Sequence, residues 1–161
     1  MIFFLSIYVI GLLGSLWHIF ALPSHQRNRA NIIEILLLYQ IVFSLGITSF
    51  VSFFGLSFLA DYIAELTQWP ASPFEQQLAN VNLAFGILGL MSIFYRGDFW
   101  LAVILGFSIW ILGDGVHHLY NAILIHNLSS GNVGVPLWTD FIVPLVLLVL
   151  LYFHRLNSSL R

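Results

Sequence analysis

Long apolar runs separated by short polar connectors occupy most of this chain of 161 residues. A helix needs about 20 mostly apolar residues to cross a bilayer. The pattern therefore predicts an all-α integral membrane bundle of five transmembrane helices, forming one domain over residues 1–161. The second run is too long for one straight crossing, so we expect a single tilted or bent helix there, with Gly46 and Gly55 as candidate bends. The five predicted spans are residues 1–22, 30–60, 74–95, 99–125 and 137–153.

The composition excludes several classes of protein. Only 7% of the residues are charged and 60% are hydrophobic, whereas about 25% of the residues of a soluble domain are charged. A soluble globule and a disordered chain are therefore excluded. Five basic residues are too few for a nucleic-acid interface. The chain has no cysteine, so disulfides and thiolate metal ligands are excluded as well.

The basic residues predict an orientation. With five spans, all five arginines fall on one side of the membrane, in the first and third connectors and the tail. Cytoplasmic segments carry an excess of Lys and Arg. The sequence therefore predicts a cytoplasmic C-terminus and an N-terminus outside. The five residues are Arg27, Arg29, Arg96, Arg155 and Arg161.

Polar side chains are densest on the fourth predicted span, which carries Asp114, His117, His118 and Asn121. At about 100° per residue these four residues share one face of a helix. Ionisable groups inside a membrane are costly and point to function. The spacing of the aspartate and the histidines lets a carboxylate and an imidazole reach one cation, or hydrogen-bond to each other.

The third and fifth spans offer matching groups. The third presents small and polar residues at alternating steps of four and three, a seam typical of helix–helix contacts. The fifth carries Asp140 near its start. At about 1.5 Å per residue, Asn82 and His118 both lie roughly 14 Å below the outer surface, so we expect one pocket in the outer half. The seam consists of Glu75, Ala79, Asn82, Gly86 and Gly89.

These groups predict a metal site without sulfur ligands. We expect zinc, iron, manganese or copper, because carboxylate and imidazole ligands suit those ions. Asn82 and Asn121 are the predicted cofactor-binding neighbours. The predicted metal ligands are Glu75, Asp114, His117, His118 and Asp140.

Several functions stay open at this point. A metal site would be either purely binding or catalytic, with redox or hydrolytic chemistry. Asp114 and the two histidines would instead serve as the relay of a proton- or cation-coupled transporter or channel. A third alternative is a membrane scaffold or complex subunit whose polar residues only hold helices together. The bilayer is the one partner predicted directly; a homo-oligomer and a small-molecule or lipid substrate stay open.

Short motifs between residues 74 and 144 resemble those of small multi-pass bacterial membrane proteins of unknown function. The resemblance implies a bacterial inner (cytoplasmic) membrane and supplies no activity. The matching pieces are Phe74-Glu75, Ala79-Asn80, Phe85-Gly86, Leu88-Gly89, Phe99-Trp100, Gly106, Gly113 with His118, Gly131-Asn132, and Asp140 with Pro144.

Overall fold

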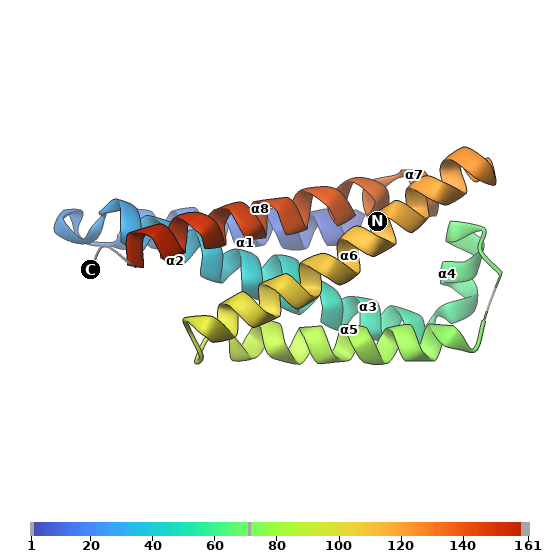
Figure 1. Ribbon diagram of the computed structural model, residues 1–161, viewed down its shortest axis with the longest axis horizontal. Helices are drawn as coiled ribbons and strands as arrows, with labels where there is room; N and C mark the ends of the chain where they lie inside the picture. Colours follow the sequence, from blue (N-terminus) through green and yellow to red (C-terminus); the bar gives the residue numbers. More distant parts are fainter. Residues whose placement is uncertain (1, 71, 159–161) are drawn as a thin grey trace.

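The computed structural model describes residues 2–70 and 72–158, and within these ranges the chain is helical with no strands. Long helices run side by side and reverse direction at each connector (Figure 1). The predicted all-α class is confirmed. In chain order the helices are α1 (Ile2–Ala21), η1 (Ser24–Gln26), α2 (Arg29–Tyr39), η2 (Gln40–Ile47), α3 (Thr48–Phe58), α4 (Ala60–Thr67), α5 (Phe74–Met91), α6 (Asp98–Leu124), α7 (Ser130–Val133) and α8 (Val135–Ser158).

The predicted count of five membrane-spanning helices is wrong. In the described part of the chain, four helices are long and apolar enough to cross a membrane. The third predicted span does form a helix, α5, but its first half carries polar residues such as Glu75, Gln76 and Asn80, which lower its hydropathy. The first predicted span also includes Met1, which lies outside the described residues. The four helices are Phe3–Ala21, Arg29–Phe58, Asp98–Leu124 and Ser130–Asn157.

The second predicted span forms one long helical segment, Arg29–Phe58, as expected. Its middle, η2, is a wider π-helical turn. Single π turns inside α-helices often occur at functional sites and distort the helix. Gly46, a candidate bend, lies within η2. The hydroxyl of Thr48, the first residue of α3, donates to the carbonyl of Ser44 in η2 at 2.8 Å.

The seam predicted on α5 faces neighbouring helices, as expected. Ala79, Asn82, Gly86 and Gly89 are all buried. A Cβ added at Gly89 would lie 2.4 Å from the Cα of Gly46, so α5 and η2 meet backbone against backbone. This contact fixes α5 beside the long second helix.

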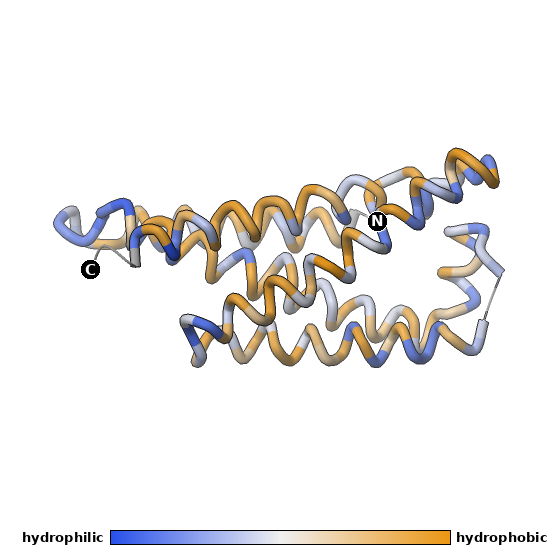
Figure 2. Tube along the Cα trace, viewed as in Figure 1, coloured by the Kyte–Doolittle hydropathy of each residue, from blue (hydrophilic) through white to orange (hydrophobic). Residues whose placement is uncertain are grey.

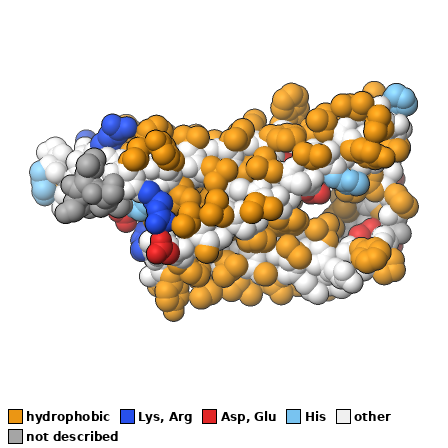
Figure 3. All heavy atoms as spheres, viewed as in Figure 1, with side chains coloured by type: hydrophobic (Ala, Val, Ile, Leu, Met, Phe, Trp, Pro, Cys, Tyr) orange, Lys and Arg blue, Asp and Glu red, His pale blue; other side chains and the backbone are white. Residues whose placement is uncertain are grey.

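The two ends of the bundle differ in charge. Figure 3 shows Arg side chains gathered at one end, whereas acidic and histidine side chains surround a hollow near the other. At the basic end Arg96 lies 3.6 Å from Glu34, and Arg155 lies 2.8 Å from Asp98. Hydrophobic residues cover the long helices between the ends (Figure 2). Arg161 lies outside the described residues.

An apolar core fills the half of the bundle next to the basic end. It joins α2, η2, α6 and α8, and the indole nitrogen of Trp100 donates to the carbonyl of Ser92 at 2.9 Å. The other half is left for the polar residues of the predicted site. The core consists of Leu37, Ile41, Leu45, Trp100, Val103, Ile104, Phe107, Leu147 and Leu151.

Candidate metal centre

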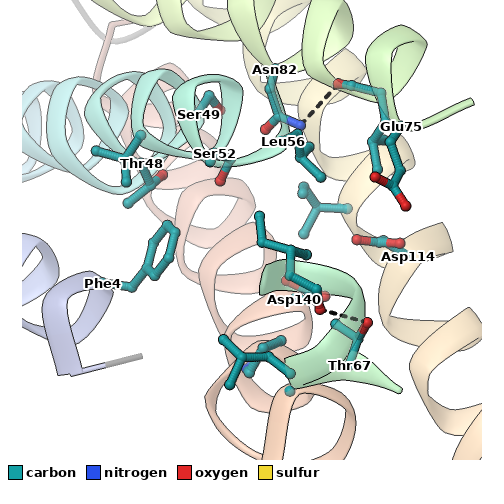
Figure 4. Close-up of a pocket in the computed structure, with 18 of the residues that line it drawn as sticks. Phe4, Thr48, Ser49, Ser52, Leu56, Thr67, Glu75, Asn82, Asp114 and Asp140 are labelled. Carbon is teal, nitrogen blue, oxygen red and sulfur yellow. Dashed lines mark hydrogen bonds between the residues drawn. The ribbon is translucent and has the colours of Figure 1, made fainter. Parts of the chain in front are cut away.

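A cavity of about 1300 Å³ opens in the half of the bundle away from the arginines (Figure 4). Side chains from α1, α3, α4, α5, α6 and α8 line it. Six of the seven residues predicted for the site are among them, and only Asn121 is not. The Asn121 amide instead donates to the carbonyl of His117 on its own helix, at 2.9 Å. The six are Glu75, Asn82, Asp114, His117, His118 and Asp140.

Asp114, His118 and Asp140 form a compact group of three at this cavity. Each offers one side-chain oxygen or nitrogen atom, and the three atoms lie within 4.8 Å of one another. Asp114 and His118 stand one turn apart on α6, and Asp140 comes from the first turns of α8. His118 is buried and the two aspartates are half-buried. One imidazole and two carboxylates at this spacing could hold a single cation.

Gly115 lets α6 and α8 approach closely enough to form the group. A Cβ at this position would lie 3.1 Å from the Cβ of Asp140 and 3.2 Å from the ring of Phe141. The Cβ of Asp140 is bonded directly to the backbone of α8, so it cannot move away without a movement of that helix. Gly115 therefore allows the two helices to approach closely, whereas an added Cβ at Gly113 would meet no described atom within 4 Å.

Asn132, on the short helix α7, holds the imidazole of His118. Its amide nitrogen donates to the carbonyls of Asn127 and His118, at 2.8 and 3.2 Å. The amide oxygen is therefore left to accept from Nδ1 of His118, at 2.9 Å. Nδ1 thus carries the proton, and Nε2 of the neutral ring presents a lone pair. In histidines that bind a metal through one ring nitrogen, the other ring nitrogen characteristically donates a hydrogen bond of this kind.

That lone pair faces a carboxylate. Nε2 of His118 lies 3.7 Å from Oδ2 of Asp140. Oδ2 is buried and has no hydrogen-bond partner among the described residues. A buried carboxylate oxygen is costly unless something positive compensates it. Two electron-rich atoms therefore lie close to one another, at a separation that two metal–ligand bonds can span.

Trp69 covers the histidines from the α4 side. Its ring centroid lies 4.8 Å from that of His118 and 5.0 Å from that of His117. The end of α4, just before Trp69, is held to the connector between α6 and α7. The carbonyl of Thr67 accepts hydrogen bonds from the side chains of Asn127 at 2.7 Å and Ser129 at 2.9 Å. Trp69 thus shields one side of the site.

Sequence reasoning missed both Trp69 and Asn132. Trp69 lies in a connector, where a tryptophan is typical of a membrane-interface anchor. Asn132 lies in a polar, Gly-rich loop, which resembles a solvated connector. The only available signal was the number of amide and hydroxyl side chains in that loop, which exceeds what a short turn needs.

Two predicted ligands lie beside the group of three. Oε1 of Glu75 accepts a hydrogen bond from the backbone of Ser72 at 3.2 Å, and Figure 4 shows its carboxylate on the same side of the cavity as Asp114. His117 is exposed and packs against Trp69 and Tyr120. Metal binding by Glu75 and His117 stays a prediction, as does a cofactor contact by Asn82, whose amide nitrogen donates to the carbonyl of Leu78 at 3.0 Å.

The fold and the cavity define an α-helical protein with four candidate membrane spans and a carboxylate–imidazole group between its helices. The chain belongs to the DUF6790 family, a family of unknown function whose model matches residues 1–159. The predicted membership of such a family is confirmed, and the match extends well beyond residues 74–144. No curated protein and no solved structure matches the chain.

Proposed function

We propose that this protein is an integral membrane protein that binds one transition-metal ion through Asp114, His118 and Asp140. The observation that carries the proposal is Oδ2 of Asp140, which has no hydrogen-bond partner in the described part of the chain. It lies 3.7 Å from Nε2 of His118, whose other ring nitrogen is held by Asn132. A metal ion between these atoms would compensate the buried carboxylate. It would also use the lone pair that Asn132 leaves on Nε2.

The donor set favours zinc, iron, manganese or copper, because it combines one imidazole with two carboxylates. Three protein ligands leave at least one coordination position for water or for a molecule from the cavity, as in catalytic zinc sites. We therefore propose a site open to a ligand rather than a closed structural one. Hydrolytic and redox chemistry both remain consistent with these residues.

Binding is favoured over transport by the distribution of polar groups. A conducting path needs polar or water-accessible lining through the membrane. In the described chain, the half toward the basic end is filled by apolar side chains such as Ile41, Trp100 and Ile104, which are fully buried. The cavity and its ionisable groups are therefore confined to one half of the bundle, which favours a binding site over a conducting path.

The arginines support a placement in the membrane. Arg27, Arg29, Arg96 and Arg155 lie at the end away from the cavity. By the positive-inside tendency, this end would face the cytoplasm and the metal site would lie in the outer half. Location in a bacterial inner membrane remains a proposal from the family resemblance.

Elemental analysis of detergent-purified protein tests the proposal. The protein is loaded with Zn²⁺, passed over a desalting column and assayed for zinc per chain. We expect one zinc for the wild type, almost none for His118→Ala or Asp140→Asn, and one for the control His126→Ala, which changes an exposed histidine that does not line the cavity. The proposal would be contradicted if the wild-type protein retained no metal after separate loading with zinc, iron, manganese and copper. A His118→Ala variant with full occupancy would contradict it equally.

A further inference from the structure

The cavity that contains the metal group is large and mostly apolar. Pockets for drug-sized ligands measure roughly 300–1,000 Å³, whereas this one measures about 1300 Å³. It follows the full length of α3 from Thr48 to Phe58. At 1.5 Å per residue that is about 15 Å, half of a hydrocarbon layer of about 30 Å. The cavity is therefore long as well as wide.

The rim of the cavity consists of exposed hydrophobic side chains. Phe58, at the end of α3, and Phe74, at the start of α5, are 73% and 70% exposed and line the cavity. In a membrane-spanning bundle, such side chains face lipid rather than water. The cavity is therefore accessible from the side, through the hydrocarbon layer. The other exposed rim residues are Phe3, Phe54, Leu59, Tyr62 and Val81.

The charges of the lining restrict the polar end of any occupant. Three carboxylates, those of Glu75, Asp114 and Asp140, line the cavity, and over residues 2–70 and 72–158 no Lys or Arg does. An anionic headgroup would be repelled, because like charges brought together in a low dielectric are strongly unfavourable. A divalent metal ion bound to the two aspartates would neutralise them and would repel a cationic head placed beside it, whereas the remaining carboxylate of Glu75 would still disfavour an anionic head.

We infer that the cavity binds a neutral long-chain lipid whose polar end is a hydroxyl group, with the alkyl chain along α3 and the hydroxyl beside Asp114, His118 and Asp140. This inference rests on the proposed metal site. The hydroxyl oxygen fits the open coordination position, and its proton has the Glu75 carboxylate as an acceptor on the same side of the cavity (Figure 4). The apolar wall provides the binding energy for the chain.

A competition between probes of one chain length tests the headgroup. Zinc-loaded protein in detergent is incubated with equal amounts of hexadecanol, hexadecanesulfonate and hexadecyltrimethylammonium, and the retained probes are quantified by mass spectrometry. We expect about tenfold more hexadecanol than either charged probe. Equal retention of the three probes, or preference for a charged one, would overturn the inference. Because the zinc content is assayed in the same samples, failure of the metal site would be seen separately.

Blocking variants test the location. Leu56 lies in the cavity wall (Figure 4), so Leu56→Trp should reduce hexadecanol retention about tenfold while zinc remains bound. Val81→Trp, at a lining position on α5, provides a second variant if the first does not fold. Leu105→Trp is the matched control, because Leu105 is exposed on α6 and does not line the cavity. Unchanged retention in both folded wall variants would overturn the inference.

Discussion

Nε2 of His118 lies 3.7 Å from Oδ2 of Asp140, across the contact between α6 and α8. This separation is too long for a hydrogen bond. Two metal–ligand bonds of about 2.0–2.2 Å can span up to roughly 4 Å between their ligand atoms. The pair is therefore already spaced for a shared cation, and metal binding requires only small side-chain movements.

Replacing Asn132 tests whether the imidazole must be held for the metal to bind. Asn132→Ala removes the acceptor of His118 Nδ1 and the donor to two backbone carbonyls. We expect zinc affinity to fall by about 10–100-fold, as for other partners of metal-binding histidines. A competitive chelator titration measures the change.

Asn121→Ala is the matched control for that titration, because the Asn121 amide bonds only to the backbone of its own helix. Its zinc affinity should equal that of the wild type. An equal loss in both variants would show that Asn132 has no special part in the site. It would also support the predicted cofactor contact of Asn121.

Two glycines on α6 allow a sharper test of the helix approach. In Gly115→Ala the added Cβ would press on Asp140 and Phe141, so Asp140 must move by a few tenths of an ångström away from the two ligands on α6. Such overpacking typically costs about 1–3 kcal/mol, which corresponds here to a loss of zinc affinity of about 5- to 150-fold. Isothermal titration calorimetry measures it.

Gly113→Ala makes the same chemical change two residues away, where the added methyl group meets nothing described within 4 Å. Zinc affinity should be unchanged, and the helix should gain about 0.5–1 kcal/mol because alanine is the better helix former. Wild-type affinity in Gly115→Ala would refute the claim that this contact positions Asp140.

The sequence predicted much of the site because helical periodicity and membrane depth are both local rules. The spacing of Asp114 and His118 placed them on one face, and the comparison of depths brought Asn82 to the same level, which agrees with the shared cavity. The seam on α5 followed from the spacing of its small and polar residues. These inferences required only that the segments be helical and roughly parallel.

What the sequence could not supply was the long-range docking of irregular segments. Asn132 reaches His118 across fourteen positions, and Thr67 accepts from Asn127 across sixty; no periodic pattern encodes such contacts. The count of spans was wrong for another reason. The polar residues in the first half of α5 were interpreted as site residues of a membrane-spanning helix. The same residues lower the hydropathy of the whole helix, so α5 is not among the candidate spans.

Trp69 should report metal binding optically. Its ring packs on both histidines, so Cu²⁺ bound beside His118 should quench its fluorescence. We expect Trp69→Phe to lose most of the copper-dependent quenching. Trp138→Phe, on the exposed face of α8, should retain it. Quenching that survives in Trp69→Phe would indicate that copper binds elsewhere.

The contact between Gly89 and Gly46 should govern the stability of the bundle without affecting the metal. In Gly89→Ala the new Cβ would lie 2.4 Å from the Cα of Gly46 and 2.8 Å from its nitrogen, and backbone atoms cannot rotate away. Separating α5 from η2 should destabilise the protein by about 1–3 kcal/mol, seen as earlier thermal unfolding in detergent. Gly106→Ala is the control, because its Cβ would make ordinary contact with the Phe85 ring at 3.6 Å. Zinc occupancy should stay at one per chain in both variants, since the three proposed ligands lie on α6 and α8. Unfolding of Gly89→Ala at the same temperature as the control would show that α5 is not held by this close approach.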